Sequence, residues 1–248
     1  MDKKLDKIIF LLEILILLSA FLFAFIAWSI IKIILVIIVF CLFASTLIYI
    51  SYNFTRKILR DRFFTLRSYT PIPFLLLMIV FAEPTVATML LGFCSVVLGE
   101  FFRFYGVAYA GSLTRVTGSV GAPQVIVAGP FSRVRNPLYV GNMLTYIGIG
   151  IMSNALFPWL VFAALVWFSF QYYQIVMAEE EFLEKEFGEA YLEFKNNVPR
   201  FLPQLVPYKS SAQEHQLPNW KEAAHSERRT FQALALVLAI LLVLWLVR

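Results

Sequence analysis

At 248 residues, the chain is 60% hydrophobic and 15% charged, with a net charge of +5. Soluble chains are about half apolar and about a quarter charged, so this composition excludes an ordinary soluble domain and indicates an integral membrane protein. The charge is too dilute along the chain to indicate a nucleic-acid partner, and it fits the basic loops of a membrane protein. The two histidines and two cysteines lack metal-type spacing, so the sequence predicts no metal site.

Apolar runs in chain order predict about six to seven transmembrane helices, at about 20 residues per crossing. The first run is long enough for two spans. The next is short and ends at Glu83–Pro84, where proline disfavours helix at the preceding residue. The expected spans lie within 8–51, 71–82, 85–108, 138–153, 156–177 and 231–247. The predicted fold is therefore all-α, a polytopic transmembrane helical bundle.

An acidic segment, AEEEFLEKEFGEAYLEFKNNVPRFLP, follows the sixth span. Its residues Leu183, Phe187, Tyr191 and Phe194 recur at helical spacing, which is typical of a helix with one apolar face. We expect this amphipathic helix, 179–195, on the cytoplasmic side. It should pack under the bundle, because anionic lipid would repel its acidic polar face.

Lysine and arginine show which ends of the spans face the cytoplasm. They concentrate in four segments: the N-terminus, 52–70, 109–137 and 179–230. The intervening turns, near 28–32, 83–84 and 153–158, contain no lysine or arginine except Lys32. Because cytoplasmic loops carry the excess of Lys and Arg, all four segments are predicted to be cytoplasmic. Arg135 and Glu180–Glu181, at the two ends of one helical hairpin, should then be neighbours.

Four regions are expected along the chain. They are 1–84, with the N-terminal spans and a basic loop; 85–203, a membrane core; 204–230, a polar linker; and 231–248, a C-terminal transmembrane helix. Within the core, Glu100 and Arg103 lie one helical turn apart in a predicted span. Charges inside a membrane are rare and often functional, and an i,i+3 pair can also neutralise itself. Both interpretations, a structural pair and the lining of a cavity, stay open.

Two motifs bracket the hairpin: GPFSRVRNPLYVG at 129–141 and EEFLEKEFGEAYLEFKNNVPRFLP at 180–203. In this order and spacing, the chain from 85 to 203 resembles the isoprenylcysteine carboxyl methyltransferase family and the related phospholipid methyltransferases. The resemblance implies S-adenosylmethionine as cofactor in a pocket that faces the cytoplasm. It also implies methyl transfer to a lipophilic small molecule that enters from the bilayer among the membrane lipids.

The same resemblance assigns site residues. The cofactor-binding set that it implies is Arg135, Asn136, Pro137, Tyr139, Gly141, Glu180 and Glu181, and the catalytic set is Glu180, Arg200 and Asn136. Asn136 stands where many members of the family have histidine, and asparagine cannot act as a base near neutral pH. An ionised carboxylate acceptor needs no base. An amine or hydroxyl acceptor needs one, and Glu180, Glu181 and Tyr139 are the nearest candidates.

Two other functions remain as alternatives. Membrane sterol and steroid reductases that use NADPH carry a similar Arg-[His/Asn]-x-x-Tyr pattern, although the E-E-x-x-L-x-x-x-F-G pattern here favours a methyltransferase. A non-catalytic scaffold or transport subunit fits the hydrophobicity but leaves the polar residues around one hairpin unexplained. The acceptor also stays open among a prenylated cysteine, a phospholipid amine, a quinone-like phenol and a small thiol.

Overall fold

The computed structural model describes residues 56–111 and 124–247, together with scattered residues between 19 and 45. The chain divides into two compact units, Met1–Tyr49 and Ile50–Arg248. In the first unit, the described residues are helical. The two spans expected within 8–51 lie largely outside the described residues, so that prediction is not tested.

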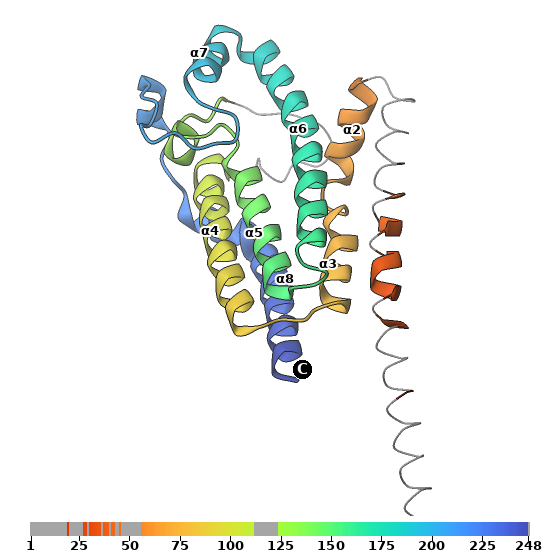
Figure 1. The fold of residues 1–248 in the computed structure, drawn as a ribbon. Coiled ribbons are helices and arrows are strands. Elements are labelled where there is room, and N and C mark those ends of the chain that lie inside the picture. Colours follow the sequence, from red (N-terminus) through yellow and green to blue (C-terminus); the bar gives the residue numbers. More distant parts are fainter. Residues whose placement is uncertain are drawn as a thin grey trace, which may run out of the picture. The chain divides into compact units, whose positions relative to one another are not determined.

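The regular elements of the second unit are all helices, and no strand occurs among its described residues (Figure 1). Its helices are α2 (Arg56–Leu66), α3 (Pro71–Val80), α4 (Val86–Ala110), α5 (Pro137–Ser153), α6 (Trp159–Phe187), α7 (Glu189–Asn197) and α8 (Trp220–Val247), with short 3-10 turns η2 (Gly129–Ser132) and η3 (Ser211–His215). The all-α class is thereby confirmed for the part of the chain that the structure describes.

By length and composition, three helices can cross a membrane: α4, α6 and α8. The apolar helix α3 has 10 residues and α5 has 17. These helices support an integral membrane protein, whereas the count of six to seven spans stays a prediction. Helix α2 shows that helix already begins in the basic segment before the short apolar run 71–82.

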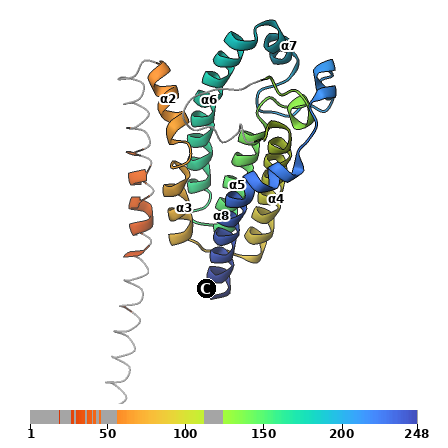
Figure 2. The same ribbon diagram turned by 180° about the vertical axis from the view of Figure 1, so that it is seen from behind.

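Helices α4, α5 and α6 lie side by side, with α8 packed on α4 (Figures 1 and 2). Glycines let α4 and α5 approach closely. A Cβ added to Gly99 would lie 2.6 Å from the carbonyl oxygen of Gly141, and one added to Gly148 would lie 2.7 Å from that of Gly92. Small residues at such contacts allow two backbones to touch. Gly141, expected at the cofactor, therefore lies in this helix–helix contact.

The acidic segment differs from the expected single helix 179–195. Helix α6 continues without a break to Phe187, because the segment after its apolar part is rich in good helix formers. Gly188 then adopts a φ of 51°, a left-handed value that glycine reaches at little cost, and α7 begins in a new direction. The amphipathic pattern is thus divided between the end of α6 and α7.

The apolar face of α7 packs as expected from the periodicity. Tyr191 and Phe194 are buried in one cluster with Val127 and Val198. Burial raises the pKa of the Tyr191 hydroxyl above its ordinary value. This cluster fastens α7 to the segment that precedes α5.

Helix α8 begins at Trp220, inside the segment expected to be a polar linker. Asn219 starts it: its backbone N–H donates to the carbonyl of Ala108 at 2.7 Å, and its side chain accepts from the N–H of Glu222 at 3.1 Å. The ring of Trp220 stacks on Tyr105 with centroids 5.9 Å apart. The start of α8 is therefore joined to the end of α4.

Candidate functional site

A buried carboxylate, Glu180 on α6, forms the centre of the candidate site. Its side chain is 5% exposed. Arg200 binds both of its oxygens, with Nε 2.9 Å from Oε1 and Nη2 2.7 Å from Oε2. Arg135 approaches from the other side, with Nη2 3.3 Å from Oε1. Two guanidinium groups therefore surround one carboxylate, and bidentate pairing of this kind is strong and geometrically specific.

Chain connectivity explains how these groups meet. Arg135 stands two residues before α5, whose first residue is the buried Pro137. Proline suits that position because the first N–H of a helix has no partner in the helix. Glu180 lies toward the end of α6, the second helix of the hairpin. The expected proximity of Arg135 and Glu180 is observed. Arg200 comes from the loop after α7, and the N–H of Arg135 donates to the carbonyl of Pro199 at 2.9 Å.

Asn136 holds this loop in place. Its side-chain amide donates to the carbonyl of Arg200 at 3.1 Å. The Arg200 side chain is 25% exposed, and its hydrogen bonds to Glu180 raise its pKa above the ordinary value. It therefore stays charged throughout the physiological range.

The neighbours of Glu180 lie in different surroundings. Glu181 is 74% exposed and pairs with Arg60 of α2 at 2.7 Å, so the structure places it outside the group around Glu180. Glu179 accepts a hydrogen bond from the hydroxyl of Tyr139 at 2.7 Å. The sequence analysis missed Glu179, although it stands beside two predicted residues in a run of three glutamates.

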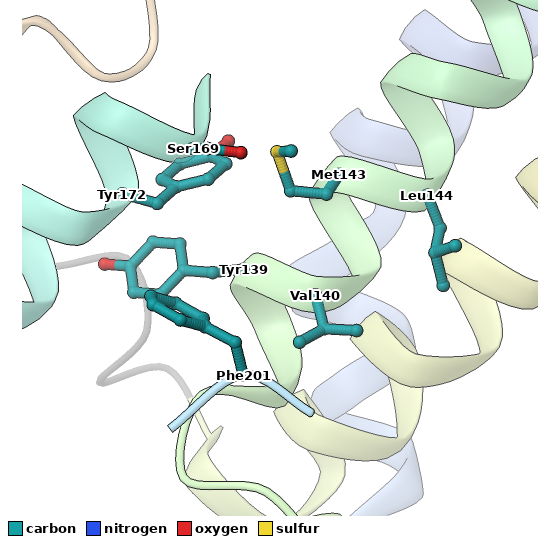
Figure 3. Close-up of a pocket in the computed structure, with 7 residues that line it drawn as sticks. All are labelled: Tyr139, Val140, Met143, Leu144, Ser169, Tyr172 and Phe201. Atoms are coloured by element: carbon teal, nitrogen blue, oxygen red, sulfur yellow. The ribbon is translucent and has the colours of Figure 1, made fainter. Parts of the chain in front are cut away.

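An apolar cavity of about 260 Å³ lies between α5, α6 and the loop after α7 (Figure 3). Its lining residues are Tyr139, Val140, Met143, Leu144, Ser169, Tyr172 and Phe201. The rings of Tyr139 and Tyr172 lie face to face at a tilt, with centroids 4.8 Å apart. Tyr139 is the one predicted site residue among them, and Phe201 directly follows Arg200. Two residues that line the cavity therefore lie close in sequence to the arginines that bind Glu180: Tyr139 follows Arg135 by four residues, and Phe201 follows Arg200 directly.

Comparison with known proteins finds a family match for part of this arrangement. Residues 87–190 match the phospholipid methyltransferases. The resemblance predicted from the sequence is confirmed, and it supports a membrane methyltransferase. The matched region contains α4, α5 and α6 with both Arg135 and Glu180. It ends before Arg200 and α8.

Individual relatives are distant. The cobalt-zinc-cadmium resistance protein CzcN of Cupriavidus metallidurans is 33% identical over 36% of this chain and 39% of its own. The nickel-cobalt-cadmium resistance protein NccN of Alcaligenes xylosoxydans xylosoxydans is 27% identical over 36% and 40%. Protein-S-isoprenylcysteine O-methyltransferase of Schizosaccharomyces pombe is 28% identical over 48% and 50%. The chain spans half or less of the length of these curated relatives, and no solved structure matches it significantly.

A second buried polar group lies between α4, α5 and α8. Arg103 of α4 contacts Glu100, one turn earlier, at 3.6 Å and Glu227 of α8 at 2.6 Å, and it donates to Asn142 of α5. Glu227 is 2% exposed. The sequence indicated the pair of Glu100 and Arg103, but not the partners from α5 and α8. Because this group joins three helices, the structure favours the interpretation as a structural pair.

Proposed function

We propose that the protein transfers a methyl group from S-adenosylmethionine to a lipophilic acceptor at the cytoplasmic face of the membrane. The observation that carries the proposal is the buried Glu180, held by Arg135 and Arg200 next to an apolar cavity. The match of residues 87–190 to phospholipid methyltransferases supports the reaction type. The carboxylate, amine or hydroxyl nature of the acceptor stays open.

The residues around Glu180 fit this cofactor. Nε of Arg135 is buried and has no hydrogen-bond partner among the described residues, so it offers a spare donor to the cofactor's carboxylate. The aromatic rings of Tyr139, Tyr172 and Phe201 can attract a sulfonium cation through their faces. One carboxylate between two guanidinium groups leaves an excess positive charge, which favours an anionic group nearby.

When bound, S-adenosylmethionine supplies an electrophilic methyl carbon on sulfur. The protein's own residues would hold the cofactor and the acceptor in place for the transfer. Glu180 holds the guanidinium groups of Arg135 and Arg200 in one arrangement, and Asn136 fixes the loop that carries Arg200. Correct placement of two reactants can provide a large part of such a rate enhancement. The aromatic lining keeps water away from the transfer.

The cavity suits the apolar part of the acceptor. Its volume of about 260 Å³ is slightly below the roughly 300–1,000 Å³ of whole small-molecule sites. We therefore assign to it the portion of a lipid near the reacting group. Its polar atoms come from Tyr139, Ser169 and Tyr172, which would hold the nucleophile against the methyl donor. Tyr139 and Glu179 are the nearest pair for a proton, should the acceptor be an amine or a hydroxyl.

The charge distribution supports a cytoplasmic orientation of this end of the bundle. Arg60, Arg133, Arg135 and Arg200 all belong to the end where α5 begins and α6 finishes. The turns at the opposite end, 81–85 and 154–158, contain neither lysine nor arginine. Cytoplasmic loops carry the excess of both residues.

Thermal unfolding of the full chain in detergent tests the proposal. S-adenosylhomocysteine should raise the unfolding midpoint and NADP⁺ should not, because a ligand stabilises the state that binds it. Stabilisation by NADP⁺ alone would instead favour a reductase, and stabilisation by neither would favour a non-catalytic role. Incubation of a membrane lipid extract with labelled S-adenosylmethionine should then transfer label to a lipid, which identifies the acceptor.

A further inference from the structure

The segment after α7, which includes the first part of the expected polar linker 204–230, runs along the loop that carries Arg135. We call residues 124–135 the site loop and residues 199–216 the strap. Hydrogen bonds join them in antiparallel order: Arg135 to Pro199 at 2.9 Å, Gln204 to the carbonyl of Arg133 at 2.9 Å, and Tyr208 to that of Ser132 at 2.8 Å. As the residue number falls in the site loop, the partner's number rises in the strap.

At the far end of the strap, the side chain of Gln216 continues this antiparallel pairing with the site loop. Oε1 of Gln216 accepts from the N–H groups of Val127 at 2.8 Å and Ala128 at 3.1 Å, and its Nε2 donates to the carbonyl of Val125 at 2.8 Å. The amide therefore binds three backbone groups, as a neighbouring strand would. Gln213 adds a bond from its Nε2 to the carbonyl of Val127 at 2.9 Å.

The backbone that Gln216 binds is buried. Val127 and Ala128 are each 5% exposed, and a buried backbone N–H without a partner is costly. Directly after them, Gly129 has a φ of 59°, and a Cβ there would lie 2.3 Å from the ring of Tyr109. The chain thus makes a tight, glycine-dependent turn into η2, whose position depends on the residues that Gln216 holds.

The same segment leads without a break to the candidate site. From Gly129, η2 and two residues bring the chain to Arg135, which contacts Glu180. Val134 between them is fully buried. A shift of Val127 and Ala128 would therefore be carried along a short, packed segment to the guanidinium of Arg135.

We propose that Gln216 is a positioning residue of the candidate site: by binding the backbone of residues 125–128, it sets where Arg135 stands. The strap lies outside the region that matches the methyltransferase family, which ends at residue 190. This inference rests on the proposed function, since it assumes that Arg135 holds the cofactor.

Binding of S-adenosylhomocysteine to the full chain in detergent tests the inference. Gln216→Ala should weaken binding about tenfold, the size expected when buried backbone groups lose their partner. The amides of Val127 and Ala128 should exchange their hydrogens faster than in the unmodified protein. Gln216→Glu keeps an acceptor for both N–H groups and should bind more tightly than Gln216→Ala.

Two further variants separate positioning from folding. Gln213→Ala removes one bond to the same segment and should weaken binding less than Gln216→Ala, which provides a milder test if the latter does not fold. Glu214→Ala is the matched control, because Glu214 is exposed in the same turn and makes none of these bonds. Its affinity and its amide exchange should equal those of the unmodified protein.

The outcomes are distinguishable. If the unmodified protein does not bind S-adenosylhomocysteine, the proposed function fails, and the inference fails with it. If the unmodified protein binds and Gln216→Ala binds equally well, the inference alone is overturned. A lower unfolding midpoint with unchanged affinity likewise overturns it, because it would assign Gln216 a purely structural role.

Discussion

The two buried polar groups, one around Glu180 and one around Arg103, have opposite compositions. Glu180 is a single carboxylate between two guanidinium groups. Arg103 is a single guanidinium between two carboxylates, Glu100 and Glu227. The first group is built from helix ends and a loop beside a cavity, and the second from residues within three packed helices. We propose that the position and the sign of the excess charge, rather than burial alone, make the first group a binding site and the second a structural contact between helices.

The largest effect, a loss of stability, is expected when the group that joins α4, α5 and α8 loses its arginine, Arg103. Arg103→Ala would leave Glu100 and Glu227 buried without their partner, and breaking such pairs costs about 3–5 kcal/mol. Detergent-denaturation curves should show a strongly reduced free energy of unfolding, whereas the remaining folded protein should bind S-adenosylhomocysteine normally. A loss of affinity without loss of stability would show that the comparison is wrong.

The reverse result is expected at the candidate site. Arg135→Ala should lower the affinity for S-adenosylhomocysteine about 100-fold, because a charge-assisted contact from a buried group is lost. Stability should change little, since Arg200 still binds both oxygens of Glu180. Isothermal titration measures the affinity, and Arg62→Ala, at an exposed arginine of α2, serves as the control. An unchanged affinity in Arg135→Ala would show that Arg135 does not bind the cofactor.

A smaller effect is expected from a change in the cavity, which should alter binding of the acceptor but not binding of the cofactor at the residues around Glu180. Phe201→Ala removes an aromatic wall of the cavity, and loss of part of that apolar contact should raise the KM for a lipid acceptor about tenfold. The affinity for S-adenosylhomocysteine should stay nearly constant. Steady-state methylation with the acceptor identified from lipid extracts provides the measurement. An equal change in both quantities would place cofactor and acceptor in one shared space.

The smallest effect is expected at Glu181, which the family resemblance assigned to the cofactor. Its exposed contact with Arg60 belongs to a class of ion pairs worth about 0–1 kcal/mol. Glu181→Gln should therefore leave methyl transfer and the unfolding midpoint almost unchanged. A large loss of cofactor affinity in this variant would restore Glu181 to the site and contradict the placement seen here.

Much of the candidate site follows from local patterns. The apolar runs predicted α4, α5 and α6, and the hairpin predicted that Arg135 and Glu180 would meet. Glu179 and Glu181 could not be distinguished in the same way. Three successive glutamates on a helix point in three directions, and the identity of the neighbour in each direction depends on how the helix is rotated in the bundle.

The sequence by itself determined the membrane class, the helical hairpin and the family motifs, because hydrophobic periodicity and the distribution of Lys and Arg are properties of short segments. Tertiary structure decided which side chains pair. Glu227 meets Arg103 across 124 residues of sequence, and Gln216 binds the backbone near Val127 across 89. Buried charges and backbone groups need partners wherever the fold brings them together, and no local pattern records which distant segment will supply them.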